Sequence, residues 1–191
     1  MLRPARVFLL LIGLVPAVGC QSPTAASATT NVDSFVDASI SPNPAIATAS
    51  TGKSYRVVRG NNQPDEVIPY QWVTTFAVTV SLNSKSTSSD VDLTFPVTVT
   101  SVAGKVEQAS GGIVTPPTGG EVEHYESIIL SSSASQVSAV GGGIQMVFQV
   151  WYALPSGNRE ALITETISMK DSHDSAKTFA KTVQIKVAPT T

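Results

Sequence analysis

Cysteine, histidine and charged residues are scarce in this chain of 191 residues. It contains one cysteine, Cys20, two histidines and 14% charged residues. A single cysteine excludes an internal disulfide and any metal site that needs a cysteine pair. The formal net charge of −2, without a cluster of Lys and Arg, argues against a nucleic-acid surface. We therefore expect neither a disulfide-stapled fold nor a nucleic-acid-binding protein.

Long hydrophobic runs and helical periodicity are also missing. The apolar stretch Val7–Val15 is interrupted only by Gly13 and is far shorter than the ~20 residues that span a bilayer. Beyond this stretch, no segment repeats apolar residues at the helical spacing of i, i+3, i+4 and i+7 between capping residues. We expect no helix outside the first 19 residues.

Residues 1–19 are predicted to be an export signal. Arg3 and Arg6 give the segment a positive start, and Val7–Val15 forms its apolar centre. Small residues, Ala17–Gly19, stand directly before Cys20. A positive start, a short apolar stretch and a small-residue cleavage site are typical of export signals.

The tetrapeptide Ala17-Val18-Gly19-Cys20 resembles the lipobox of bacterial lipoproteins, with Ala17 where that family usually has Leu. The resemblance implies that Cys20 is alkylated with diacylglycerol, that the chain is cut before it, and that the new amino group is acylated. Two or three acyl chains give stable membrane attachment. Gln21 stands where the inner-membrane retention signal has Asp, so in a Gram-negative cell the outer membrane is expected. The alternative is an ordinary secretory signal followed by a coincidental cysteine.

The mature chain is expected to consist of a tether, 20–32, and a single domain, 33–191. The tether residues are small, polar and nearly uncharged, so they bury too little apolar surface to fold. The remaining length suits one domain. Loss of Arg3 and Arg6 leaves 10 of the 12 basic residues against 14 acidic ones, a formal charge of −4.

Apolar and polar residues alternate along most of the domain. In Trp72–Leu82 the even positions are large and mostly apolar and the odd ones smaller and mostly polar, which indicates a half-buried strand. The other predicted strands are Val91–Val99, Ile144–Tyr152, Ala161–Met169 and Phe179–Val187, with weaker patterns in Phe35–Ile40, Ser54–Val58, Val106–Val114 and Val122–Leu130. Pro96 cannot donate a ladder hydrogen bond, so its segment is expected at an edge or a bulge.

These patterns predict an all-β fold, an antiparallel β-sandwich of roughly seven to nine strands separated by turn-forming residues. The layout resembles immunoglobulin-like and fibronectin type III-like domains, with Ser41-Pro42-Asn43-Pro44 near its start and a final strand containing Val183, Ile185 and Val187. The cysteine pair of antibody domains is missing. Trp72 is a candidate for the core tryptophan of a central strand.

Neither histidine lies in a pattern typical of catalysis or metal binding. On a strand, His124 and Glu126 point to the same face, away from Glu121 and Glu123, and would supply two metal ligands, whereas zinc sites take three or four, so a solvated strand face is preferred. His173, in Asp171-Ser172-His173-Asp174, has the ingredients of a triad, but adjacent loop residues do not create triad geometry and a turn is preferred. We expect no enzyme activity, no cofactor and no metal.

A possible binding surface is predicted around Trp151. Neighbouring strand residues point to opposite faces, so if Tyr152 enters the core, Trp151 points outward beside Gln145 and Gln149. A Trp among amides suits contact with a sugar ring or a partner protein. The alternative is a Trp covered by a neighbouring loop or strand. The long connector Ser110–Gly120 is either functional or simply mobile.

The expected function is a lipid-anchored, non-enzymatic binding or structural module of the cell envelope. One alternative is an accessory subunit of an envelope assembly, with an exposed strand edge that pairs with another protein. A second is a β-sandwich protease inhibitor that uses the glycine-rich loop around Pro117–Gly120.

The lipid anchor predicts the behaviour of a Cys20→Ser variant. Without the thiol no diacylglycerol can be attached, so the variant should remain uncleaved or be released from membranes. Fractionation with a carbonate wash, and mass spectrometry of the N-terminal peptide, test this. A variant that stays with the membrane, together with an unlipidated Cys20 in the wild type, would contradict the anchor.

Overall fold

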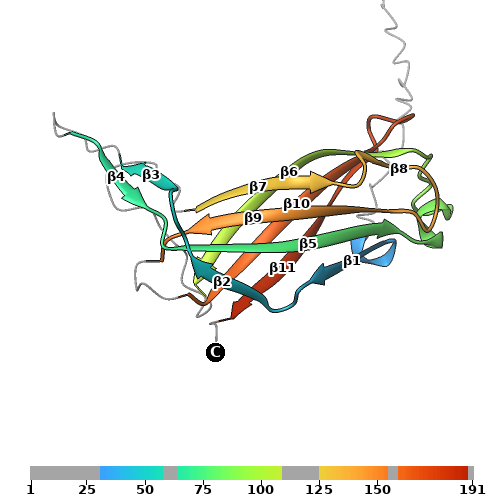
Figure 1. Ribbon diagram of the computed structural model, residues 1–191. Helices are drawn as coiled ribbons and strands as arrows, with labels where there is room; N and C mark the ends of the chain where they lie inside the picture. The colour runs from blue at the N-terminus through green and yellow to red at the C-terminus, as the bar shows by residue number, and fades with distance from the viewer. Residues whose placement is uncertain (1–30, 58–63, 109–124, 155–158, 189–191) are drawn as a thin grey trace, which may run out of the picture.

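The computed structural model describes residues 31–57, 64–108, 125–154 and 159–188, and there the regular structure is almost entirely β (Figure 1). The strands are β1 (Val36–Ser41), β2 (Ala45–Ala49), β3 (Ser54–Val57), β4 (Glu66–Pro69), β5 (Trp72–Leu82), β6 (Val97–Gln108), β7 (Tyr125–Ser132), β8 (Gln136–Val137), β9 (Gly143–Tyr152), β10 (Ala161–Asp171) and β11 (Thr178–Ala188). The helical elements described are two short 3-10 turns, η1 (Val32–Ser34) and η2 (Ser84–Thr87). Neither could cross a membrane. The all-β prediction is confirmed.

Nine strands form one curled sheet in the order β7-β9-β5-β2-β11-β10-β6-β8, with β1 also paired to β5. Strands β3 and β4 form a separate hairpin that projects from one end of the sheet (Figure 1). The pairings among described strands are antiparallel except for β2 with β11, where Ala45 pairs in parallel with Val187. A wholly antiparallel arrangement was therefore wrong at this junction.

The junction arises because β1 and β2 pair in succession with the same strand. Ile40 is the register partner of Val78, and Ala47 is the partner of Thr74, both on β5. Between β1 and β2 stand residues 42–44, whose two prolines lack the N–H groups that a continuous ladder needs. After this break β2 lies between β5 and β11 and joins the two halves of the sheet.

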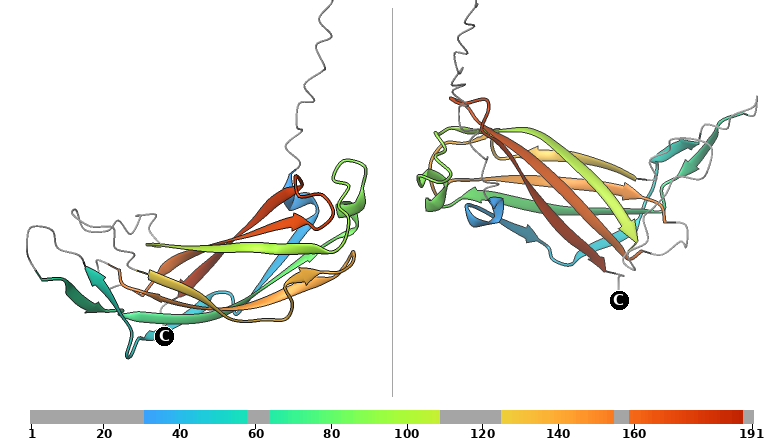
Figure 2. Two further views of the ribbon diagram at one scale, coloured as in Figure 1. Left: turned by 90° about the horizontal axis from the view of Figure 1, so that it is seen from above. Right: turned by 180° about the vertical axis from the view of Figure 1, so that it is seen from behind.

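The sheet curls around a concave side (Figure 2), and the buried hydrophobic side chains form one core cluster. Phe76 on β5 and Phe148 on β9 are register partners whose ring centroids lie 5.5 Å apart. Buried side chains of the other half, such as Ile163 on β10 and Ile185 on β11, belong to the same cluster. Alternating burial therefore confirms the predicted strands in β5, β9, β10 and β11.

The predicted strand Val91–Val99 was wrong over most of its length, because β6 begins only at Val97. The preceding residues form a loop after η2, in which the Leu93 N–H donates to the carbonyl of Ser86. Leu93 is nevertheless buried, so its loop repeats the alternation of a strand without being one. Pro96 lies directly before β6, where a missing donor breaks no ladder bond.

Several short strands were not predicted. They are β2, β4 and β8, of five, four and two residues. Their alanine, glutamate and proline content is low in β-propensity, so their pairing depends on the neighbouring long strands. They raise the number of strands in the described residues to eleven, above the expected seven to nine.

The N-terminal predictions fall largely outside the described residues. The export signal, Cys20 and most of the tether lie in residues 1–30, and His124 and Ser110–Gly120 lie in residues 109–124. The described chain starts at Asn31, whose side chain accepts a hydrogen bond from the Asp33 N–H at the start of η1. Val32 already packs against the core.

The stacked phenylalanines predict where truncation destabilises the fold. Phe76→Ala should lower the free energy of unfolding by about 3–5 kcal/mol, because it leaves a cavity beside Phe148. Urea unfolding followed by circular dichroism measures this. The control is Thr75→Ala on the exposed face of the same strand, which should change stability by less than about 0.5 kcal/mol. Equal losses in both variants would contradict the assigned core.

Candidate functional site

The outer face of β5, β9 and β7, opposite the core, carries the residues predicted to bind a partner. On β9, Gln145, Gln149 and Trp151 alternate with fully buried residues. Gln145 is exposed, whereas Gln149 and Trp151 are half-buried. Trp151 therefore lies outside the core, and the question is what covers it.

Trp151 is partly covered by Lys53, which follows β2 in the chain. The Lys53 Nζ lies 3.7 Å from the centroid of the Trp151 ring and 2.6 Å from the Glu126 Oε1 on β7. Glu126 and Val73 are the register partners of Trp151 on the two neighbouring strands. We call Lys53, Val73, Glu126 and Trp151 the Trp151 cluster.

The position of Lys53 is fixed by the base of the β3–β4 hairpin. The Tyr70 N–H donates to the carbonyl oxygen of Lys53 at 3.0 Å, and the Ser50 N–H donates to that of Gln71 at 2.9 Å. The ion pair itself is partly exposed to solvent, so it contributes less than about 1 kcal/mol. The Lys53–Glu126 ion pair therefore adds little to the stability of the domain.

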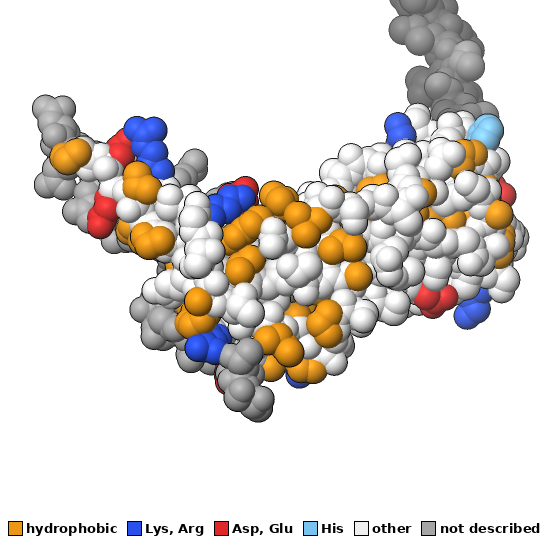
Figure 3. Space-filling view, in the orientation of Figure 1, with side chains coloured by type: hydrophobic (Ala, Val, Ile, Leu, Met, Phe, Trp, Pro, Cys, Tyr) orange, Lys and Arg blue, Asp and Glu red, His pale blue; other side chains and the backbone are white. Residues whose placement is uncertain are grey.

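Apolar side chains continue from the Trp151 cluster along the same face. Ile128 is the register partner of Gln149, and Val147 is the partner of Ala77, all on the outer side and most of them half-buried. Figure 3, which views this face, shows hydrophobic side chains gathered between the projecting hairpin and the middle of the sheet. The face combines an aromatic ring, aliphatic side chains and a charged rim.

This arrangement suits a protein partner better than a sugar. Stacking of a sugar needs a free face of the aromatic ring, and the Lys53 ammonium occupies one face of Trp151. Protein interfaces commonly place a Trp beside charged groups that remain at the rim. The alternative to a binding surface is that Trp151 is simply covered in part by the neighbouring loop, through the same contact with Lys53.

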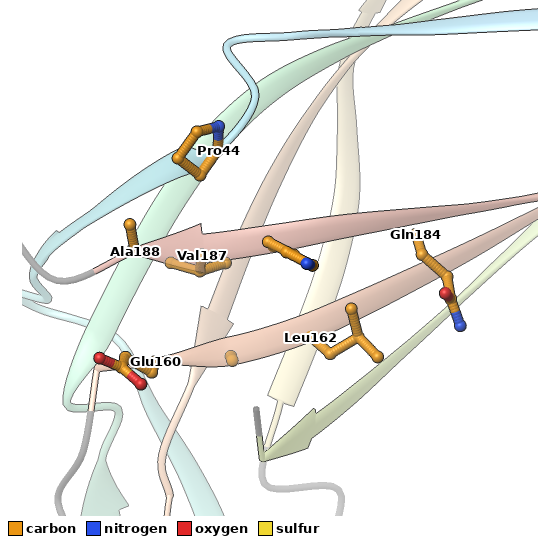
Figure 4. A pocket seen from close by; sticks show the side chains of 8 residues that line it. Pro44, Glu160, Leu162, Gln184, Val187 and Ala188 are labelled. Carbon is orange, nitrogen blue, oxygen red and sulfur yellow. The ribbon is translucent and has the colours of Figure 1, made fainter. Parts of the chain in front are cut away.

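A hollow of about 510 Å³ lies on a different face, over β10 and β11 (Figure 4). It is lined by Pro44, Glu160, Ala161, Leu162, Gln184, Lys186, Val187 and Ala188. Ligand sites usually combine apolar walls with a few converging polar groups. Here the polar side chains, Glu160, Gln184 and Lys186, are all exposed, so we assign no ligand to the hollow.

A buried carboxyl, Glu165, is the feature that sequence reasoning missed. Its side chain is 0% exposed on the inner face of β10, between Ile163 and Ile167. The Ser127 hydroxyl donates to the Glu165 Oε1 at 2.7 Å, while the Oε2 has no hydrogen-bond partner among the described residues. Burial raises the pKa of Glu165 to about 7, against the lowering effect of the Ser127 hydrogen bond.

Gly104 on β6 makes room for this carboxyl. It is the register partner of Glu165, and a Cβ at its position would lie 2.9 Å from both the Glu165 Oε1 and the Ser127 Cβ. The Tyr125 hydroxyl donates to the Gly104 carbonyl at 3.0 Å. A glycine within a valine-rich strand signals such a close approach, but the sequence does not say of what.

The residues around His173 form the predicted turn between β10 and β11. The buried Asp171 carboxylate accepts hydrogen bonds from the N–H groups of Thr94, His173 and Asp174. Burial alone would raise the pKa of Asp171, but these hydrogen bonds, together with Lys177, lower it. The His173 side chain is exposed.

Metal binding finds no support in the part of the chain that the structure describes, which holds no group of three or more candidate ligands. His124 lies outside that part. Comparison with known proteins adds no assignment: no family model matches the chain, and no curated protein matches it.

The buried Glu165 predicts how stability depends on pH. Its folded-state pKa is above the ordinary value of 4.5, so the folded chain holds a proton that the unfolded chain releases. This stabilisation is complete below pH 4.5 and is lost as pH rises through about 7, a change of about 3 kcal/mol at ~1.4 kcal/mol per pKa unit.

Urea unfolding between pH 4 and 8 measures the effect as the difference between the wild type and Glu165→Gln. The variant should lack this fall in stability, while the exposed control Glu160→Gln should retain it. Parallel pH profiles for the wild type and Glu165→Gln would show that Glu165 does not titrate as described.

Proposed function

We propose that this chain is a lipid-anchored, non-enzymatic β-sandwich module of the cell envelope that binds a partner protein through the Trp151 cluster. The observation that carries the proposal is the geometry of Trp151, which is half-buried on the face opposite the core, with Lys53 over its ring and Glu126 beside it. Trp is among the residues most enriched at the energetic centres of protein interfaces.

The surroundings of the Trp151 cluster support a protein contact. Ile128 and Val147 extend the apolar surface, and Gln145 and Gln149 supply amides that donate and accept hydrogen bonds. Lys53 and Glu126 neutralise each other, so the partner need not carry a strong charge of one sign. An interface of this composition has an apolar centre and a polar rim.

Attachment to the envelope rests on the lipobox resemblance at Cys20. The small polar residues that follow would hold the domain a few tens of Å from the bilayer when extended, at ~3.1 Å per residue. In a Gram-negative cell, Gln21 after the cysteine favours the outer membrane. The domain would then meet partners in or near that membrane.

The order of strands supports an immunoglobulin-like sandwich. The series β1-β5-β9-β7 and β6-β10-β11 follow the connectivity of strands A-B-E-D and C-F-G in constant-type immunoglobulin domains. The chain departs from those domains by lacking the cysteine pair. Trp72 also differs, since it lies on β5, the second strand of that scheme, and is only partly buried.

An accessory role within a larger assembly is a second candidate, supported by β7. This strand ends the order of the sheet and exposes Ile129 and Leu130 by 43% and 50%. It contains no lysine or proline, the residues that commonly protect sheet edges from pairing. The protease-inhibitor alternative rests on Pro117–Gly120, which lies outside the described residues.

The binding proposal predicts position-specific cross-linking in intact cells. A photoreactive amino acid at Gln149, on the proposed surface, should give one defined protein adduct. The same group at Gln184, on the outer face of β11, should not. Equal adducts from both positions, or none from Gln149, would contradict a partner at this face.

Trp151→Ala should then weaken binding of the cross-linked partner by more than about 1 kcal/mol, roughly fivefold in Kd, with little change in Tm. The matched control is Trp72→Ala, which removes a ring that packs against the core and should mainly lower Tm. If Trp151→Ala instead unfolds the domain with unchanged affinity in the folded fraction, Trp151 serves stability and not binding.

A further inference from the structure

Strand β7 is held to the two halves of the sheet in different ways. On one side it pairs with β9 from Tyr125 to Ser132, with an irregularity after Ile129. On the other side it approaches β6 without a ladder among the described pairings. Two side-chain hydrogen bonds cross this gap, from Ser127 to Glu165 and from Tyr125 to the Gly104 carbonyl.

The groups around Glu165 do little to stabilise a negative charge on its carboxyl. Its inward-facing neighbours on β6 are Val102, Gly104 and Val106, and those on β7 are Tyr125 and Ser127. The other inward-facing neighbours are Val150 on β9, Ile163 and Ile167 on β10, and Val183 on β11. The titratable group among them is the Tyr125 phenol, whose hydrogen is donated to Gly104. Lys105 and Glu107 pair with each other on the opposite face of β6, and Glu126 pairs with Lys53 on that of β7.

Ionised Glu165 would therefore be a buried charge with a single donor, Ser127, and no described cation in contact. Such a group must gain water or take up a proton. Water can enter most readily where no backbone ladder has to break, and the gap between β6 and β7 is such a place. Glu165 lies directly beneath this gap, since it contacts Ser127 on one side and Gly104 on the other.

We propose that the protonation state of Glu165 controls the packing of β7. The protonated carboxyl holds β7 against β6 and β10, and the ionised carboxylate releases β7 at this edge. Release gives the carboxylate access to water and frees the inward side chains of β7, Tyr125 and Ser127, from their partners on β6 and β10. The edge at β7 then opens more often at and above neutral pH than in acid. This inference does not depend on the Trp151 cluster.

The size of the effect follows from linkage. If opening exposes Glu165 to water, the carboxyl in the open state titrates near its ordinary value of 4.5 and in the closed state near 7. The opening equilibrium of β7 then increases by about 40-fold between pH 5 and pH 7 and flattens above that range.

Hydrogen exchange of the purified full chain, read by mass spectrometry and corrected for the intrinsic chemical rate, tests this directly. Amides of β7 should lose about 40-fold in protection between pH 5 and pH 7, and at both pH values they should be less protected than those at Phe76–Val80 in the central strand β5, which exchange only when the whole domain unfolds. Glu165→Gln should abolish the pH dependence, and Glu160→Gln should leave it unchanged. Ser127→Ala should weaken protection of β7 already at pH 5.

Three results would overturn the proposal, and the first two can be obtained from the wild type alone. Protection of β7 that is equal at both pH values would show that Glu165 does not control this edge. Equal protection of β7 and β5 at both pH values would show that ionisation lowers global stability without local release. A pH dependence that persists in folded Glu165→Gln would assign the effect to another group.

Discussion

Closure of the curled sheet on itself is the constraint on which the rest of the structure depends. The inner residues of β5 and β9 are buried only because those of β10 and β11 face them. On one side the closure is made by backbone hydrogen bonds, since β2 pairs with both β5 and β11. On the other side, between β6 and β7, the described contacts are side-chain hydrogen bonds centred on Glu165 and Gly104. The two sides therefore differ in kind: one is a ladder and the other depends on the protonation of a carboxyl.

The curl of the sheet places the residues that stabilise the fold and those available to a partner on different sides. The concave side is filled by the core, so side chains available to a partner must lie on the convex side or at the edges. The two tryptophans illustrate the division. Trp72 packs against the core with the Arg159 guanidinium 4.4 Å from its ring centroid, whereas Trp151 lies on the opposite face under Lys53. Both rings contact a cation, but only Trp151 is placed where a partner could cover it.

The sequence predicts the long strands that have one buried and one exposed side. In β5, β9, β10 and β11, burial of one side makes apolar and polar residues alternate with a period of two. The loop before β6 shows the limit of this signal, because Leu93 is buried from a loop and its neighbours imitate a strand. Short strands such as β2 carry no signal of their own, since Ala45 and Ala47 are buried through pairing with partners distant in sequence.

The same limit applies to the candidate sites. Alternation placed Trp151 on the outer face, but the Lys53 contact joins segments that no local pattern connects. Glu165 stood at an inward position of a predicted strand, and this was a sign of a buried carboxyl. Its partner Ser127 is 38 residues away in the sequence. Gly104 by itself indicates only a position that weakens a strand, and its role becomes clear once the side chain opposite it is known. Long-range pairing, which depends on the whole topology, supplies what the sequence lacks.

The closure is tested most directly by the titration of Glu165 itself. In a carbon-13 NMR titration of the glutamate side-chain carboxyls, with the resonance assigned by its loss in Glu165→Gln, the account predicts a midpoint near pH 7. A Glu165 midpoint near the ordinary value of 4.5 would mean that the carboxyl is solvated, and that β6 and β7 do not close over it.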